Sequence, residues 1–312
     1  MSVAGAASAA RLHRPVVSVG NLATGGRGKT PVVALVTRLL LEAGERPAIL
    51  SRGYGRRLRE DGVVVVSDGD HLLADLDRSG DEPLMLARAL PGARVAVCDV
   101  RALAGALAER ALGATVHVLD DGFQHRALAR TLDLVIVTPG DLADRRMPFG
   151  RLRESPAALG RADAVIIDGD LPSERLPGRR VFRLVRHAGA LEAVDAAGLE
   201  VPPVPPGPVV AVAGIARPER LQATLEAAGW QVSGFLGFGD HHRFRAADLA
   251  RIADAARAAS AAAVVTTMKD AERLRPWRPL PVPVFAQPLT AAVEPADEFR
   301  EWLLATLQER AA

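Results

Sequence analysis

The strongest constraint on the fold is an alternation of short Val- and Ile-rich runs with amphipathic stretches. Apolar runs occur at residues 16–20, 47–51, 95–98, 115–121, 132–138 and 162–168, and again at 209–215, 232–238, 262–268 and 283–287. Helical spacing follows near 218–228, 246–260 and 296–310. Near-continuous hydrophobic strands that alternate with helices indicate a parallel sheet covered on both faces. The sequence therefore predicts an α/β protein.

A proline-rich stretch separates two series of predicted strands. The segment "HAGALEAVDAAGLEVPPVPPGP" at 187–208 shows no strand or helix periodicity and contains a proline cluster, as expected of a connection. The chain, at 312 residues, is long enough for two domains. We predict a P-loop NTPase-like domain over 1–188, a linker over 189–208, and a second, smaller α/β domain over 209–312, with a cleft between the domains.

Composition excludes several classes of protein. A net charge of +2 argues against a protein that coats nucleic acid, and the single cysteine, Cys98, excludes an internal disulfide. No apolar run approaches the length of a transmembrane helix, and the first fifteen residues lack the apolar segment of a signal peptide. Almost all of the basic residues are arginines, since Lys29 and Lys269 are the only lysines.

A glycine-rich segment, "GGRGKT", stands between the first predicted strand and a helical pattern. Its end fits the phosphate loop G-x-x-x-x-G-K-[ST], although Ala23 occupies the position of the first glycine. Backbone N–H groups, the start of a helix and Lys29 would bind phosphate, and the Thr30 hydroxyl would bind Mg²⁺. The alternative is a plain glycine-rich turn. The predicted nucleotide-binding residues are Ala23, Thr24, Gly25, Gly26, Arg27, Gly28, Lys29 and Thr30.

Paired acids end another predicted strand, in "HVLDDGFQH" at 117–125. A carboxylate at a strand tip in the same sheet as a phosphate loop is typical of a magnesium site, so Asp120 and Asp121 are candidate ligands. A solvated turn is the alternative. Gln124 and His125 follow in the loop, where either could contact nucleotide or substrate, or make structural hydrogen bonds.

Further acids and histidines occur outside these motifs. Asp81 and Glu82 precede an apolar helix, where helix capping is the alternative to a chemical role. Asp240, His241 and His242 follow a strand of the second predicted domain. A carboxylate paired with a histidine could take a proton from an attacking hydroxyl.

An arginine-rich loop and a second lysine complete the candidates. "RRMPFGRLRE" at 145–154 surrounds an apolar Met-Pro-Phe with arginines, which suits either a solvated loop or contact with an anionic amphiphile. Lys269 and Asp270 follow a strand of the second domain, as cleft residues or as a structural ion pair.

With these motifs in view, the sequence resembles the tetraacyldisaccharide 4′-kinase family. The off-pattern phosphate loop, with Ala23, is itself a feature of that family. The resemblance spans residues 16 to 274 and rests on "VGNLATGGRGKTP", "SRGYGR", "GDEP", "VAVCDVR", "DDGFQH", "RLRE", "VAGIARPERL", "DHH" and "TTMKDAERL".

The resemblance implies a reaction and a set of residues. It implies that the γ-phosphoryl group of ATP is transferred, with Mg²⁺, to the 4′-hydroxyl of a tetraacyldisaccharide 1-phosphate, giving lipid IVA in lipid A biosynthesis. Asp81 and His241 would form the dyad that activates the hydroxyl, with His242 as an alternative to His241. The implied metal residues are Thr30, Asp120, Asp121 and Glu154, and the implied substrate residues are Tyr54, Arg101, His125 and Arg153.

The resemblance also implies a location and partners. The enzyme would be peripheral on the cytoplasmic face of the inner membrane and would bind a lipid disaccharide 1-phosphate, no nucleic acid and no obligate protein partner. Family members commonly carry an N-terminal membrane-seating segment, whereas fifteen residues precede Val16 here. Attachment is therefore expected to use the arginine-rich loop and apolar surface. The family's Pro-Ala-Gly is Pro148-Phe149-Gly150 here, which is expected to alter acyl-chain contacts.

Two other classes of protein share part of the pattern. A nucleotide-switch protein that positions other proteins also has a deviant phosphate loop and paired acids, but needs no second α/β domain with a DHH loop. A P-loop enzyme that acts on a small soluble acid would have little use for Arg145, Arg146 and Phe149 in one loop.

Overall fold

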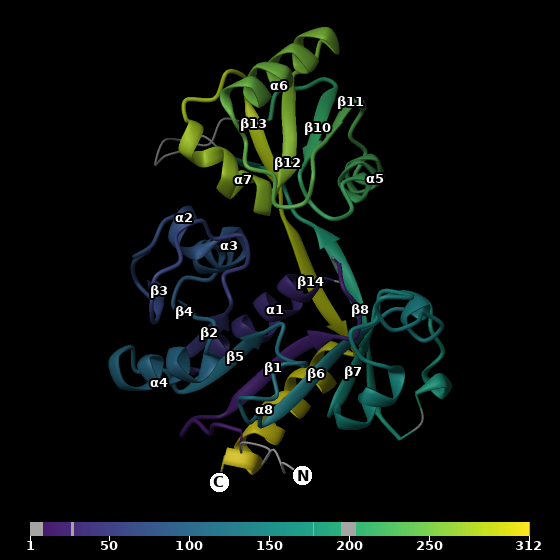
Figure 1. Cartoon of the computed structure of the whole chain (residues 1–312). Helices are drawn as coiled ribbons and strands as arrows, with labels where there is room; N and C mark the ends of the chain where they lie inside the picture. The colour runs from purple at the N-terminus through teal and green to yellow at the C-terminus, as the bar shows by residue number, and fades with distance from the viewer. Residues whose placement is uncertain (1–8, 26–27, 177, 195–203, 312) are drawn as a thin grey trace. The chain divides into compact units, whose positions relative to one another are not determined.

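The protein consists of two compact units. The computed structural model describes residues 9–25, 28–176, 178–194 and 204–311. Unit 1 comprises the chain up to Val185 together with the chain from Ala291 onward, and unit 2 is Arg186–Thr290 (Figure 1). Gly26, Arg27 and residues 195–203 of the predicted linker lie outside the described residues.

A nine-stranded sheet forms the centre of unit 1. Its strands are β1 (Val16–Asn21), β2 (Pro47–Ser51), β3 (Val64–Asp68), β4 (Arg94–Val97), β5 (Val116–Asp120), β6 (Leu132–Val137), β7 (Ala164–Ile167), β8 (Arg180–Ala188) and β14 (Leu289–Glu294). The order is β14-β8-β7-β6-β1-β5-β2-β4-β3, parallel from β8 to β4 and antiparallel between β4 and β3. The loops after the parallel strands therefore share one edge, the carboxyl edge of the sheet.

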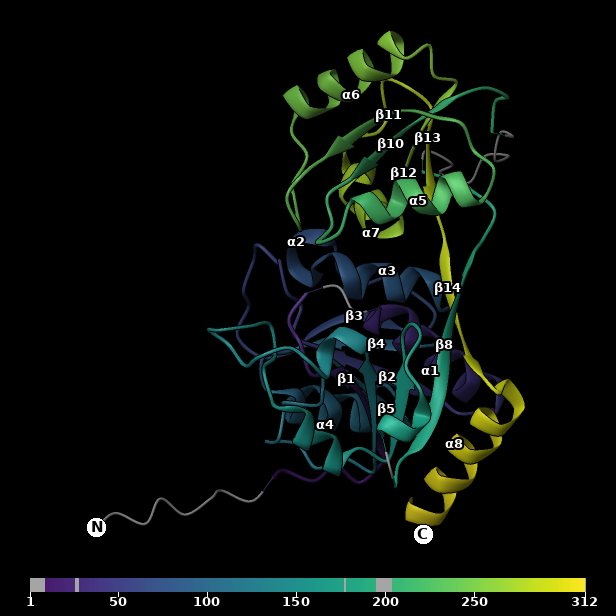
Figure 2. The ribbon, with the colours of Figure 1, turned by 90° about the vertical axis from the view of Figure 1, so that its right-hand side faces the viewer.

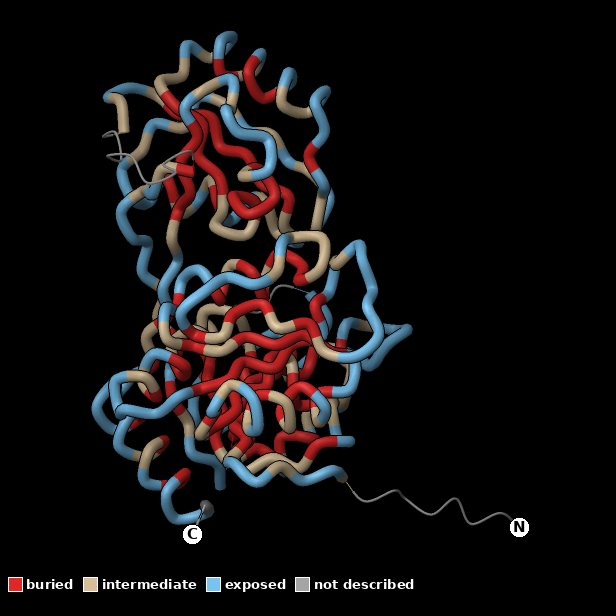
Figure 3. The backbone as a smooth tube through the Cα atoms, turned by 90° about the vertical axis from the view of Figure 1, so that its left-hand side faces the viewer, coloured by how far each residue is buried: buried red, intermediate tan, exposed pale blue. Residues whose placement is uncertain are grey.

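Helices cover both faces of this sheet. They are α1 (Lys29–Glu42), α2 (Leu76–Ser79), α3 (Asp81–Ala89), α4 (Arg101–Ala111) and α8 (Ala296–Ala311). Alternate strand residues point to opposite faces: Val17 and Val19 join α1, α3 and α8 in one apolar cluster, whereas Val16 joins α4 in another. This two-sided burial explains the continuous apolar runs, and Figure 3 shows buried backbone at the centre of each unit.

Unit 2 repeats the layered plan on a smaller scale. Its strands are β9 (Glu192–Ala193), β10 (Val209–Ala213), β11 (Val232–Gly237), β12 (Ala263–Thr267) and β13 (Val284–Gln287), in the order β11-β10-β12-β13-β9. Only β9 pairs antiparallel in this part of the described chain. The helices α5 (Glu219–Ala227), α6 (Ala246–Ala258) and α7 (Met268–Leu274) pack on the two faces (Figure 2), α5 on one and α6 with α7 on the other.

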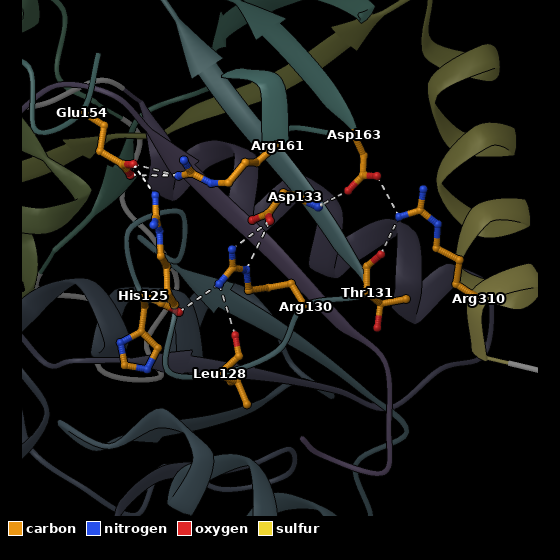
Figure 4. A network of polar contacts seen from close by, with 10 residues as sticks. His125, Leu128, Arg130, Thr131, Asp133, Glu154, Arg161, Asp163 and Arg310 are labelled. Carbon is orange, nitrogen blue, oxygen red and sulfur yellow. Dashed lines mark hydrogen bonds and ion pairs between the residues drawn. The ribbon is translucent and has the colours of Figure 1, made fainter. Parts of the chain in front are cut away.

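The predicted α/β class with a mostly parallel sheet is confirmed, but the domain boundaries differ from the prediction. Residues from Ala291 onward, predicted to close the second domain, belong to unit 1. The reason is that α8 buries its apolar side chains in the first core: the Phe299 ring lies 5.0 Å from the Phe182 ring, edge to face. At the end of α8, Arg310 binds the Asp163 carboxylate at 2.7 Å and the Thr131 carbonyl at 2.8 Å (Figure 4).

Part of the predicted linker forms a strand. Glu192 and Ala193, within the predicted linker, form β9 on the edge of the second sheet. No helix in the described part of the chain is long and apolar enough to cross a bilayer.

The packing of α8 generates a stability prediction. Replacing Phe299 by alanine should destabilise unit 1 by about 3–5 kcal/mol, because it opens a cavity beneath Phe182. The exposed control on the same helix, Gln308→Ala, should change stability by less than about 0.5 kcal/mol. Urea unfolding followed by circular dichroism and by tryptophan fluorescence measures the difference, and Trp302, which packs on both phenylalanines, contributes to that fluorescence. Equal midpoints for the two variants would contradict the assignment of α8 to this core.

Candidate functional site

The glycine-rich segment has the backbone of a phosphate loop where it is described. β1 ends at Asn21 and α1 begins at Lys29, capped by Gly28 in the left-handed region with φ 73°. Gly25 is also left-handed, with φ 91°. Ala23 is not among the non-glycine residues with positive φ, and its buried methyl group packs with Phe123 and Leu152. A glycine is therefore unnecessary at Ala23, which accounts for the departure from the usual pattern.

A buried asparagine that the sequence analysis did not single out organises this loop. Asn21 is fully buried at the end of β1, and its side-chain oxygen accepts from Lys29 Nζ at 3.2 Å and from Arg153 Nη2 at 2.5 Å. Its amide nitrogen donates to the Ala23 carbonyl at 2.7 Å, and its own carbonyl accepts from Gln124 Nε2 at 3.0 Å. Asn21 thus joins the phosphate loop to the loops after β5 and β6. Its sequence signals were the buried strand that it ends and its place in the string "VGNLATGGRGKTP".

The two acids at the end of β5 lie in different electrostatic environments. Arg153 binds both oxygens of Asp121, at 2.8 Å each, and Lys29 Nζ lies 3.4 Å from Oδ1. Burial disfavours the Asp121 carboxylate, but Arg153 and Lys29 outweigh burial and lower its pKa. Asp121 also adopts a left-handed backbone, φ 54°, a conformation that costs energy and is concentrated at functional sites.

Among the described residues, Asp120 has no arginine partner that offsets the cost of burying its carboxylate. Burial, then repulsion from Glu82 and Asp121, raises the pKa of Asp120 to about 7, against the weaker effects of Lys29 and of a 3.3 Å hydrogen bond from Ser51 Oγ. A buried carboxylate among other carboxylates has the chemistry of a hard cation site. The residues present therefore fit a magnesium ion at Asp120, with the Thr30 hydroxyl at the start of α1 as the second protein oxygen.

Glu154, the fourth predicted metal residue, lies in a separate network. It accepts from Arg126 at 3.0 Å and from Arg161 at 2.9 Å (Figure 4). Within the described ranges, no three Asp, Glu, His or Cys side chains form a group that could hold a metal ion. The geometry therefore brings Asp120 and Asp121 together and leaves Glu154 paired with arginines.

The predicted substrate residues surround the same edge of the sheet. Arg101 is buried at the start of α4, and burial, followed by repulsion from Arg52, lowers its pKa against attraction to Asp120 and Asp121. Burial and the neighbouring Arg101 and Arg52 lower the pKa of His125. Such crowding of cations is favourable when an anion is bound. Tyr54, by contrast, is 68% exposed in the loop after β2.

Asp81 is buried rather than solvated. It is the first residue of α3, preceded by the cap residue Gly80, and its carboxylate accepts the backbone N–H of Glu82 at 2.9 Å. A carboxylate at the positive end of a helix is favoured in its ionised form. The capping interpretation and a role as an acceptor for a protonated partner are both compatible with this placement.

The two histidines of unit 2 are distinguished by their partners. His242 Nε2 contacts Asp248 at 2.9 Å, and its ring stacks on Phe238 at 4.6 Å. His241 has a left-handed backbone, φ 58°, and its Nε2 lies 3.0 Å from Lys269 Nζ, which is also 3.3 Å from Asp240. His242 is therefore part of the packing of its loop, whereas His241 is grouped with the charged residues Asp240 and Lys269.

A buried ion pair fixes the loop that carries these histidines. Asp270 and Arg273 on α7 are 3.0 Å apart and almost fully buried. Asp270 accepts the N–H of Gly214 at 3.0 Å, while Arg273 donates to the carbonyls of Gly214 and His242 at 3.0 and 2.9 Å. Asp270 is thus structural, as one reading of the sequence proposed, and Lys269 points to the histidine loop.

Comparisons with known proteins agree over nearly the whole chain. The model of the tetraacyldisaccharide-1-P 4′-kinase family matches residues 2–308. The tetraacyldisaccharide 4′-kinase of Syntrophus aciditrophicus is 37% identical, over 96% of this chain and 86% of the relative. That of Anaeromyxobacter dehalogenans is 42% identical, over 86% and 74%. The crystal structure of LpxK from Aquifex aeolicus, an "apo" form in complex with ATP, superposes with a TM-score of 0.77 at 31% identity, over 96% of this chain and 90% of that one.

The role of Asn21 generates a binding prediction. Asn21→Ala removes the oxygen that positions Lys29 and Arg153, so affinity for a magnesium nucleotide should fall about tenfold. Ser18→Ala, at a buried polar residue on the same strand, should leave the affinity unchanged. Titration calorimetry with a non-hydrolysable nucleotide measures both, and thermal unfolding establishes that both variants are folded. Unchanged affinity in folded Asn21→Ala would exclude this positioning role.

The raised pKa of Asp120 generates a pH prediction. The folded pKa of about 7 exceeds the ordinary aspartate value of 3.8, so the folded state binds more protons between these values and stability falls as pH rises through this window. Asp120→Asn removes this loss. In the absence of metal and nucleotide, the variant should gain about 1–3 kcal/mol relative to the wild type between pH 5 and pH 8. Denaturant unfolding at the two pH values measures the gain, and a constant difference would contradict the prediction.

Proposed function

The chain belongs to the tetraacyldisaccharide-1-P 4′-kinase family, and on this premise we propose which of its residues carry out the reaction. The enzyme transfers the γ-phosphoryl group of ATP to the 4′-hydroxyl of a tetraacyldisaccharide 1-phosphate, the step of lipid A biosynthesis that forms lipid IVA. The observation that supports the assignment of residues most strongly is the network in which Asn21 joins Lys29, Arg153 and Asp121 at the carboxyl edge of the first sheet.

The phosphate loop binds the nucleotide. Backbone N–H groups from Ala23 to Thr30 and the positive end of α1 surround the phosphates, and Lys29 leaves Asp121 to contact the transferred group. Asp120 and Thr30 would hold the magnesium ion, which would neutralise phosphate charge. Asp121 does not bind the metal directly, because Arg153 already occupies both of its oxygens. Glu154 serves the metal only after it exchanges its partners Arg126 and Arg161.

Asp81 and His241 activate the acceptor. His241 takes the proton of the 4′-hydroxyl as the oxygen attacks phosphorus, and Asp81 stabilises the resulting imidazolium. His241 is favoured over His242 because Asp248 and the Phe238 ring already engage His242. Most of the acceleration comes from charge placement around the loose transition state, and proton removal adds roughly 10²- to 10⁴-fold.

The acceptor lipid binds beside the nucleotide. Arg101, His125 and Arg153 supply cationic or hydrogen-bonding groups for the phosphate of the disaccharide, and the exposed Tyr54 packs on the sugar. A lipid acceptor requires work at a membrane surface, so the enzyme acts as a peripheral protein on the cytoplasmic face of the inner membrane. Nucleic acid and an obligate protein partner have no place in this function.

Radiolabelled ATP and a detergent-dispersed tetraacyldisaccharide 1-phosphate test the whole function. We expect a labelled lipid that forms only with Mg²⁺ and whose label is at the 4′ position. ATP hydrolysis with no labelled lipid would instead favour a nucleotide-switch protein, and label on a small soluble acid would favour the other class of P-loop enzyme.

The proposed dyad generates a kinetic prediction. At saturating substrates, Asp81→Ala and His241→Ala should each lower kcat by about 10²- to 10⁴-fold, and the double variant should be little worse than either single one, because the two residues act as a unit. His242→Ala should retain more kcat than His241→Ala, although it loses packing against Phe238. Near-normal kcat in folded His241→Ala would refute the dyad.

A further inference from the structure

One loop of unit 1 exposes large apolar side chains that nothing in the catalytic proposal uses. Residues 145–150, here named the tip loop, lie between β6 and β7. Phe149 is 83% exposed and Met147 is 54% exposed. Phe149 is the most exposed large hydrophobic side chain of the described residues. An exposed apolar group of this size indicates an interaction surface when it is held in place and accompanied by charge.

The tip loop is held rigidly with these side chains outward. Leu152 N donates to the Arg145 carbonyl at 3.0 Å, Met147 N donates to the Leu152 carbonyl at 2.9 Å, and a third bond runs from Phe149 N to the Arg146 carbonyl at 3.0 Å. Gly150 is packed so closely that an added Cβ would lie 2.2 Å from the Arg145 carbonyl oxygen. The closed turn keeps Phe149 away from the protein core, so its exposure is a property of the fold.

The charge of the tip loop is positive and uncompensated. Arg151 is bound by Asp144 at 2.9 Å, whereas neither Arg145 nor Arg146 forms an ion pair with any residue that the structure describes. Both arginines are exposed. Two free cations beside an outward Phe and Met match an anionic bilayer, where arginines contact lipid phosphates and apolar side chains enter the acyl boundary.

The tip loop is attached directly to the phosphate loop. Ala23 pairs with Leu152, Thr24 N donates to the Arg151 carbonyl at 2.9 Å, and Arg153 N donates to the Leu22 carbonyl at 2.7 Å. Because β1 and β6 are parallel neighbours, their following loops share the carboxyl edge that carries Lys29 and Asp120. A membrane bound to the tip loop would therefore lie beside the nucleotide site.

We propose that the tip loop is a membrane-docking wedge for anionic bilayers, in which Met147 and Phe149 insert and Arg145 and Arg146 bind lipid phosphates. Its purpose rests on the proposed function, since docking at this edge would present the site to a lipid acceptor. Docking itself requires no catalysis, so it can be tested separately.

Vesicle co-sedimentation tests the wedge, with phosphatidylcholine vesicles and vesicles that also contain phosphatidylglycerol. The wild type should bind the anionic vesicles in a salt-sensitive way and bind phosphatidylcholine weakly. Phe149→Ser should weaken binding about tenfold, and Arg145→Gln and Arg146→Gln about fivefold each. Two matched controls should bind like the wild type: Leu73→Ser, 48% exposed beyond β3, and Arg38→Gln, exposed on α1.

A second measurement reports insertion directly. Cys98 is buried and is the only cysteine, so Phe149→Cys and Leu73→Cys can each carry one polarity-sensitive dye. The dye at 149 should shift to the blue with anionic vesicles, and the dye at 73 should not. The proposal is overturned if the wild type does not bind anionic vesicles, if Phe149→Ser binds as well as the wild type, or if both dyes respond alike.

Kinase activity on the detergent-dispersed lipid separates this proposal from the proposed function. Phe149→Ser should keep near-normal kcat there, because the detergent removes the need for docking. If the wild type phosphorylates no dispersed lipid, the proposed function fails, whereas sedimentation and the dye shift still decide the wedge.

Discussion

The binding of Asp121 by Arg153 and Lys29, arranged on the buried Asn21, is the interaction on which the rest of unit 1 depends. Two carboxylates end one buried strand, and ionised neighbours of this kind repel each other strongly in a low dielectric. Arg153 fixes one of them as an anion, so the electrostatic cost falls on Asp120. In the free protein, the buried Asp120 carboxylate therefore carries an electrostatic cost that a bound cation would relieve. This is the usual relation between stability and function at an active site.

In unit 2, a buried ion pair holds a loop with a strained backbone. Its histidine loop has a left-handed residue at His241 and must hold that conformation against its cost. The Asp270–Arg273 pair supplies the restraint, because three hydrogen bonds join these two side chains to the backbone at Gly214 and His242. Breaking such a pair leaves a buried charge and is strongly destabilising. The pair therefore holds the backbone of the loop that carries His241 and His242.

The sequence predicted the buried parallel strands well, because strands covered on both faces are written as continuous apolar runs. It missed β8, whose "RVFRLVRHA" has an arginine at every third position of its first seven residues, and β14, which reaches the first sheet from residues about a hundred positions later. Long-range pairing of this kind leaves no local signal, so the return of α8 to unit 1 was also missed.

In the candidate site, the sequence singled out the paired acids Asp120 and Asp121. The difference between their pKa values depends on Arg153, which is 32 positions away from Asp121 in the sequence. Spacing alone does not show which acid an arginine will reach.

The choice of lysine at two positions follows from the same geometry. Arg153 binds Asp121 through two nitrogens of a planar fork, an arrangement suited to a permanent contact. Lys29 contacts Asn21 and Asp121 at longer distances through a single nitrogen on a flexible stem, so it can move to an arriving phosphate while Arg153 keeps Asp121 in place.

Lys269 has an equivalent position beside His241. Since an ammonium group can only donate, it holds Nε2 as the acceptor, and any proton that reaches Nε2 must displace it. Both lysines of an arginine-rich chain thus contact a candidate site residue through a single nitrogen on a flexible stem.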